Sequence, residues 1–171
     1  MPSFISETYN LDSKISILTG VLLPIFSLLC TKFAAKIHLT FIPNLLVCSA
    51  LFFGIGLTCC LLLFFFYQTV PVLSVFLLAL FSGCMHGVNL MLISYLPAKL
   101  ADQAHLSTMV GLTNSFVYIG SAVSTYVIPM VAESHGWSAT LLIWVIIAVI
   151  GTAACTLGIP FYSRKTKKGV A

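Results

Sequence analysis

Five long apolar stretches, separated by short segments that hold nearly every charge, dominate this sequence of 171 residues. A helix needs about 20 apolar residues to cross the hydrocarbon core of a bilayer, and each stretch is that long. Only 7% of the residues are charged and 60% are hydrophobic, whereas a soluble globular domain carries about 25% charged residues. The sequence therefore predicts an all-α integral membrane protein with five transmembrane helices. The expected spans are residues 15–35, 45–67, 71–96, 107–131 and 139–162.

The basic residues predict how the chain is oriented. Seven of the eight Lys and Arg residues lie in segments on one side of the membrane, and basic residues favour the cytoplasmic side. We therefore expect residues 1–14 to be an external polar segment, residues 15–162 to form the membrane domain of a multi-pass cell-membrane protein, and residues 163–171 to be a basic cytoplasmic tail. Anionic lipid headgroups suffice as a partner for the tail, so we expect no nucleic-acid partner. The seven residues are Lys32, Lys36, Lys99, Arg164, Lys165, Lys167 and Lys168.

A row of small and polar residues runs along the fourth span at steps of four, three, four, three and four residues. This spacing keeps all six on one side of a helix. Polar groups in hydrocarbon need partners or water, so this polar seam is expected to face other helices or a wet cavity. Asn114 and Tyr118 are the members able to bind a ligand, whereas Gly111, Ser121 and Thr125 suit close helix packing. The polar seam consists of Ser107, Gly111, Asn114, Tyr118, Ser121 and Thr125.

The third span has a second polar face, which Ser82, His86 and Asn89 share. His86 is the only ionisable residue deep in any expected span, and such a residue indicates a functional site. A neutral imidazole bonded to a neighbouring helix is the alternative interpretation, and both stay open. Beside this face, Gly83 and Gly87 form a small-xxx-small pair, which lets another helix approach closely.

The spans offer little for catalysis or metal binding. They contain no acidic residue, and no nucleophile motif of the GxSxG type is present to pair with His86. The six cysteines all lie within spans without zinc-type spacing, so we interpret them as packing residues. We therefore expect no enzyme activity, no catalytic residue, no metal and no cofactor.

The spans also differ in apolarity. Residues 45–67 and 139–162 have the fewest polar side chains, so we expect them at the lipid-facing periphery. The other three spans carry the small and polar residues and are expected to lie more centrally.

Several motifs resemble the C-terminal part of major facilitator superfamily transporters. The run Leu96-Pro97, a short polar linker and Ser107-Thr-x-x-Gly111 resembles the cytoplasmic link between the tenth and eleventh helices. Residues 2–11 resemble the junction of the seventh and eighth helices, and Ile17-Leu-x-x-x-Leu22-Leu-Pro-Ile25 fits the eighth. The general character is that of the organophosphate:phosphate antiporter and related anion-symporter branches. The last two helices are matched by Gly111-x-x-Asn114-x-x-x-Tyr118-Ile-Gly120-Ser-Ala, followed by Gly136-Trp137.

Two features depart from the family pattern. The first cytoplasmic connection, residues 31–38, lacks the acidic-then-basic gating pattern that is common at that position. The phosphate-binding arginines of organophosphate carriers also have no counterpart, because no arginine lies in any span.

The resemblance implies a secondary active transporter of a small solute, in which two six-helix halves surround a site at the midplane. This chain would then represent helices eight to twelve of twelve, contribute one wall of the translocation cavity, and be inactive alone. An autonomous small membrane protein that acts as an accessory subunit of a larger carrier is the alternative. The expected partners are the lipid bilayer, a small-molecule solute, and either the missing N-terminal half or another carrier subunit. The residues expected along the substrate pathway are His86, Asn89, Asn114 and Tyr118.

Overall fold

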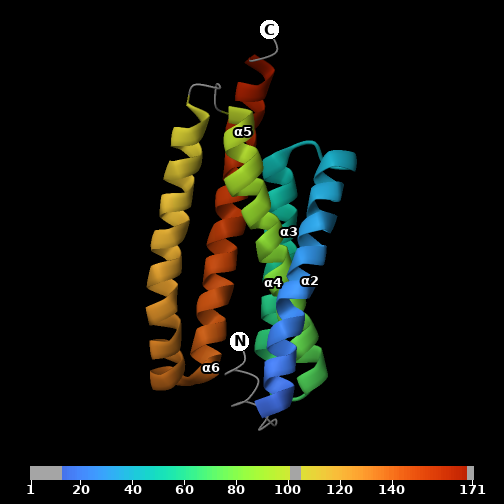
Figure 1. Ribbon diagram of the computed structural model, residues 1–171, viewed down its shortest axis with the longest axis vertical. Coiled ribbons are helices and arrows are strands. Elements are labelled where there is room, and N and C mark those ends of the chain that lie inside the picture. Colours follow the sequence, from blue (N-terminus) through green and yellow to red (C-terminus); the bar gives the residue numbers. More distant parts are fainter. Residues whose placement is uncertain (1–12, 101–104, 169–171) are drawn as a thin grey trace.

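The computed structural model describes residues 13–100 and 105–168, and in that part every regular element is a helix (Figure 1). The all-α prediction is confirmed. Most of the expected external segment, residues 1–12, lies outside the described residues, as do residues 169–171 of the expected tail. The elements are α2 (Ser13–Thr40), α3 (Leu45–Phe66), α4 (Pro71–Asn89), the π-helix η1 (Leu90–Tyr95), α5 (Leu96–Leu100) and α6 (Leu106–Lys168).

Helix α6 spans 63 residues, but the chain reverses direction at Gly136. Gly136 has φ 78° and ψ 177°, a backbone conformation that is essentially restricted to glycine because a side chain would clash there. We call residues 106–135 the first limb and residues 137–168 the second limb. Figure 1 shows the two limbs lying antiparallel, the first in yellow and the second in orange to red. The described part of the chain therefore forms five long rods that alternate in direction.

Three helices in the described part are long and apolar enough to cross a membrane: Leu45–Phe66, Pro71–Lys99 and Leu106–Ser163. The last includes both limbs of α6, and each limb has roughly 30 residues, or about 45 Å at 1.5 Å per residue. The chain is therefore a multi-pass membrane protein. The first expected span lies within α2, whose 28 residues measure about 42 Å against a hydrocarbon core of about 30 Å. The structure therefore contains five rods of sufficient length, and their crossing of the membrane stays a prediction.

Helix α3 lies at the centre of the packed part of the chain. It packs most extensively against α6 and α4, and α2 packs mainly against α4. One buried cluster lies where α2, α3 and α4 meet and includes Ala34, Leu45, Phe52, Val88 and Met91. A second cluster joins α3 and α4 to the second limb and contains Cys59, Leu63, Leu77, Leu78 and Leu141.

Burial among the described residues follows a different order from the expected central and peripheral placement, which itself stays a prediction. Helix α3, expected at the periphery, has eight buried residues. In the first limb, expected to be central, no residue from 105 to 139 is buried. Apolarity cannot distinguish a neighbouring helix from lipid, because lipid tails are as apolar as leucine. The uniform apolarity of residues 45–67 therefore does not show what covers them.

Candidate functional site

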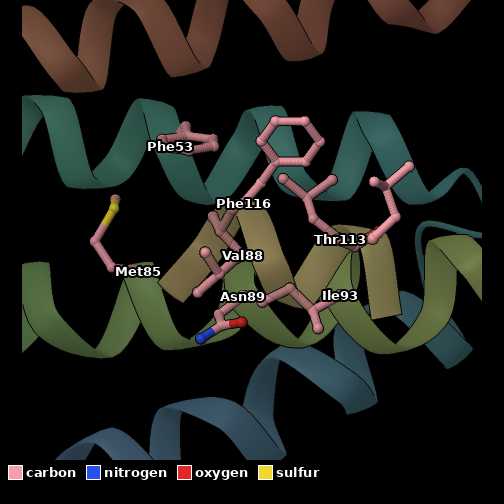
Figure 2. A pocket seen from close by; sticks show the side chains of 10 residues that line it. Phe53, Met85, Val88, Asn89, Ile93, Thr113 and Phe116 are labelled. Carbon is pink, nitrogen blue, oxygen red and sulfur yellow. The ribbon is translucent and has the colours of Figure 1, made fainter. Parts of the chain in front are cut away.

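A pocket of about 540 Å³ opens between α4, η1 and the first limb of α6, with α3 behind it (Figure 2). Most of its surface is apolar, and the two polar side chains on its wall are Asn89 from α4 and Thr113 from the first limb. Figure 2 shows Phe53 on α3 and Phe116 on α6 among the side chains around it. The lining residues are Phe53, Met85, Val88, Asn89, Leu92, Ile93, Leu112, Thr113, Phe116 and Val117.

The π-helix η1 forms part of the pocket wall. Its last turn is closed by a hydrogen bond from the backbone N–H of Leu96 to the carbonyl of Met91, five residues earlier. Short π-helical segments inside α-helices are rare and frequently lie at functional sites. Here η1 begins directly after Asn89, so the change of helical type coincides with the polar part of the wall.

The polar groups near the pocket differ in whether they are satisfied. The Thr113 hydroxyl donates to the Met109 carbonyl at 2.8 Å, so its donor is already used. His86, on the same helix as Asn89, is exposed, and its Nδ1 lies 2.8 Å from the Ser82 carbonyl. That contact leaves Nε2 available. The Asn89 carboxamide is exposed and forms no hydrogen bond within the described residues.

The polar seam lies away from the pocket. Leu112, Thr113, Phe116 and Val117 face the pocket, and at 100° per residue their centre lies about 150° around the helix from that of the polar seam. Tyr118 is 73% exposed, and Asn114 is partly exposed. The four predicted pathway residues therefore belong to two surfaces: His86 and Asn89 on α4, and Asn114 and Tyr118 on the far side of the first limb.

The predicted packing residues also divide into two groups. Gly83 lies against α2, where an added Cβ would be 2.5 Å from the Cys30 sulfur, and Gly87 faces Ala34. An added Cβ at Gly111 would have no atom within 4 Å. Ser121 and Thr125 are exposed, and the Thr125 hydroxyl bonds the Ser121 carbonyl of its own helix. Of the five predicted packing residues, only Gly83 and Gly87 are at a helix contact within the described part of the chain.

A second polar cluster joins the end of α2 to α5, and the sequence did not indicate it. His38 is 3% exposed, its Nδ1 lies 2.9 Å from the Ile42 carbonyl, and its Nε2 lies 3.2 Å from Lys99 Nζ. Lys99 also donates to the Pro43 carbonyl at 3.5 Å. Since an ammonium group only donates, Nε2 accepts and the proton of a neutral imidazole sits on Nδ1.

Burial shifts the titration of His38, which lies beyond the expected first span. Desolvation lowers the pKa of His38, and the positive charge of Lys99 lowers it further, while the Ile42 carbonyl opposes the shift. The neutral form that the hydrogen bonds require is therefore the favoured one. Sequence separation hid this cluster, because the two side chains are 61 positions apart.

The residue patterns of the single helices did not indicate the pocket either. The only signal was spacing: Met85, Asn89 and Ile93 recur every four residues, as do Leu112 and Phe116. Such spacing predicts a shared face on each helix, but not that the two faces meet.

Among the residues in the described part, no group of three or more His, Cys, Asp or Glu side chains is arranged to hold a metal ion. The polar groups of the pocket and polar seam are neutral hydrogen-bonding groups, which can bind and orient a solute.

The model of the protein family described as Major Facilitator Superfamily matches residues 1–171. Comparison with curated proteins gives no match, and neither does comparison with solved structures.

Proposed function

The chain belongs to the major facilitator superfamily, whose members are transporters, and we propose that it forms part of a secondary active transporter of a small solute. It contributes one wall of the translocation cavity. The observation that carries this proposal is the pair of polar surfaces on α4 and the first limb that no described helix covers. In a membrane, such surfaces need water, a solute or further helices.

The substrate pathway in this proposal includes His86, Asn89, Asn114 and Tyr118. His86 and Asn89 offer an imidazole nitrogen and a carboxamide without partners in the described part of the chain. Tyr118 and Asn114 offer a hydroxyl and a second carboxamide on the first limb. All four groups can hold a solute by neutral hydrogen bonds that break as readily as they form, as transport requires.

The chain by itself is inactive under this proposal. Transporters of this type enclose a midplane site between two sets of helices that rock against each other. The exposed polar seam offers a surface for the second set, which is either the other half of a transporter or a separate carrier subunit. We further propose that the transporter lies in the cell membrane, with the end of α6 on the cytoplasmic side, from the distribution of lysine and arginine.

Uptake measurements test the proposal. Cells that make the chain together with the second set of helices that the proposal requires are supplied in turn with radiolabelled glycerol 3-phosphate, glucose, tetraphenylphosphonium and the uncharged, largely apolar chloramphenicol, and the same solutes are offered to proteoliposomes that contain only the purified chain. We expect saturable uptake of at least one solute in cells and none in the proteoliposomes. Saturable uptake by the chain alone would contradict its partial nature.

Substitutions test the pathway. His86→Ala and Asn114→Ala are expected to lower the saturable uptake in cells by about tenfold each, the effect of about 1.4 kcal/mol of lost binding. Leu157→Ala is the control, since Leu157 is 71% exposed on the second limb, outside the pathway. If both pathway variants transport as well as the control, the assignment is wrong. Unchanged solute specificity with altered maximal uptake would instead favour the accessory-subunit alternative.

A further inference from the structure

We infer that the pocket between α4, η1 and the first limb binds an uncharged, mostly apolar molecule that carries one hydrogen-bonding group. This inference rests on the proposed transport function, because it names the class of solute that the pocket admits. Its volume of about 540 Å³ lies within the roughly 300–1,000 Å³ of small-molecule sites. The pocket is therefore large enough for a whole small molecule, beyond a single water or methyl group.

Charge is excluded by the surroundings of the pocket. No Asp, Glu, Lys or Arg occurs in residues 45–66, 71–98 or 105–132, which include every lining residue. Lys99 is six positions beyond Ile93, or about 9 Å along the rod, and is held by His38 and Pro43. Burying an ionised group without a partner in an apolar site costs several kcal/mol or more. An organophosphate therefore finds no lysine or arginine counter-charge among the lining residues.

Aromatic and aliphatic side chains supply the main binding surface. Phe53 approaches from α3 and Phe116 from the first limb, while Met85 adds an adaptable thioether side chain. Figure 2 shows these side chains on three different rods around the same space. Apolar walls from several helices favour a hydrophobic ligand body, which each wall contacts on a different side.

Asn89 supplies the single polar contact. Of the two polar side chains on the wall, the Thr113 hydroxyl already donates to Met109, whereas Asn89 has no partner in the described part of the chain. A carboxamide has two donors and an acceptor with two lone pairs, so it can bond an alcohol, an amide or a carbonyl. A ligand with one such group satisfies Asn89 while its apolar part fills the rest.

Photolabelling of the purified chain in phosphatidylcholine nanodiscs tests this inference. The probe is 3-azioctanol, a neutral alcohol with a photoreactive diazirine, compared with an eight-carbon diazirine carboxylic acid and an eight-carbon diazirine alkane. Labelled residues are mapped by mass spectrometry. We expect the alcohol to label Phe53, Met85 or Phe116 saturably and more strongly than either comparison probe, with competition by excess 1-octanol.

Three variants sharpen the test. Asn89→Leu should weaken labelling by the alcohol about fivefold, as expected for the loss of about 1 kcal/mol with one hydrogen bond, while Thr156→Val, on the second limb and outside the pocket, should not. Leu112→Trp, at a position 59% exposed, should fill the pocket and abolish labelling without disturbing the core. Leu157→Trp on the second limb is the matched control.

Equal labelling by alcohol and alkane with no effect of Asn89→Leu would overturn the inference, because the pocket would then simply hold lipid chains. Stronger labelling by the acid would overturn it as well. This outcome can be told apart from a failure of the transport proposal. If the pocket is not labelled but His86→Ala still impairs uptake, only the inferred class of solute is wrong. If the pocket is labelled but His86→Ala and Asn114→Ala leave uptake unchanged, the proposed transport role is wrong.

Discussion

Two parts of the chain differ in how their neighbours hold them. The packed part consists of α2, α3, α4 and the second limb of α6, which share two buried clusters. Within it, α2 and α4 lie so close together at Gly83 that there is no room for a side chain at that position. The first limb has no buried residue from 105 to 139, although it is equally helical. Figure 1 shows it as the yellow rod at the edge of the bundle.

The difference shows that helix formation and helix packing have separate causes in this protein. In lipid, a helix satisfies its own backbone and is stable as a helix without neighbours. Packing requires small residues or matched shapes at a contact. The first limb has the small residues, in the polar seam, but they face away from the packed part. This supports the proposal that other helices or a solute complete that surface.

The largest expected effect comes from placing a side chain at the tightest contact of the packed part. Gly83→Leu would put a Cβ 2.5 Å from the Cys30 sulfur, forcing α2 and α4 apart at a cost of about 3 kcal/mol. Unfolding is measured by adding sodium dodecyl sulfate to mixed micelles and following the fluorescence of Trp137 and Trp144. Gly111→Leu on the first limb is the control, because nothing lies within 4 Å of its added Cβ. Equal losses would mean that the two parts are packed alike.

Removing volume from the packed part should have the next largest effect. Leu141 is fully buried in the cluster that joins the second limb to α3 and α4. Leu141→Ala should lower the free energy of unfolding by about 2 kcal/mol, the low end of the range for a buried leucine. The low end applies because the unfolded chain is surrounded by apolar detergent, so the substitution removes packing contacts but little hydrophobic transfer energy. Leu142→Ala, at a half-exposed neighbouring position, should change the same unfolding curve little. A similar loss at both positions would contradict the assigned face of the second limb.

A smaller effect is expected from acid at the cluster of His38 and Lys99. The pKa of His38 is lowered in the folded chain. Between that lowered pKa and the ordinary histidine value of about 6.5, His38 therefore binds more protons in the unfolded chain than in the folded one. Stability is therefore complete above that pH and falls as the pH drops toward the lowered pKa. Below the lowered pKa no further loss arises from this group.

The measurement is the detergent unfolding midpoint between pH 7.5 and 5. His38→Gln should remove the pH-dependent part of the midpoint, and Lys99→Met should reduce it, because the ammonium charge opposes protonation. A midpoint that falls equally with acid in wild type and His38→Gln would assign the effect to other groups.

How much the sequence predicts depends on whether a property belongs to one helix or to two. Hydropathy placed the rods: the expected span 45–67 overlaps α3, and Gly136, where α6 reverses, lies between the expected spans 107–131 and 139–162. Boundaries were less accurate, since α2 continues to Thr40 and the third rod continues through Pro97 to Leu100. Helices project beyond the hydrocarbon core, so apolarity ends before the helix does.

Which residues of different helices meet was not predicted. Ser82 and Ser27 meet across α4 and α2 at 3.2 Å, and Lys99 meets His38, yet no spacing rule connects positions 55 or 61 residues apart. The pathway residues follow the same logic. The pattern placed Asn114 and Tyr118 on one face, but that face turns away from α4, so the pattern did not give their position relative to His86 and Asn89.

The smallest expected effect on stability is at Tyr118, and it separates the two parts of the chain most clearly. Tyr118→Ala removes a large side chain that is 73% exposed, so the unfolding of the purified chain should change by less than about 0.5 kcal/mol. Tyr162→Ala, at a buried position in the second limb, is the comparison and should be clearly destabilising in the same detergent titration. Uptake in cells should respond differently from stability. Tyr118→Ala should lower saturable transport at an unchanged protein level, because under the proposal the Tyr118 side chain contacts the solute only in the assembled pathway. A loss of stability at Tyr118 in the purified chain would mean that the first limb already packs through the polar seam, and the surface would then be unavailable to a solute or a partner.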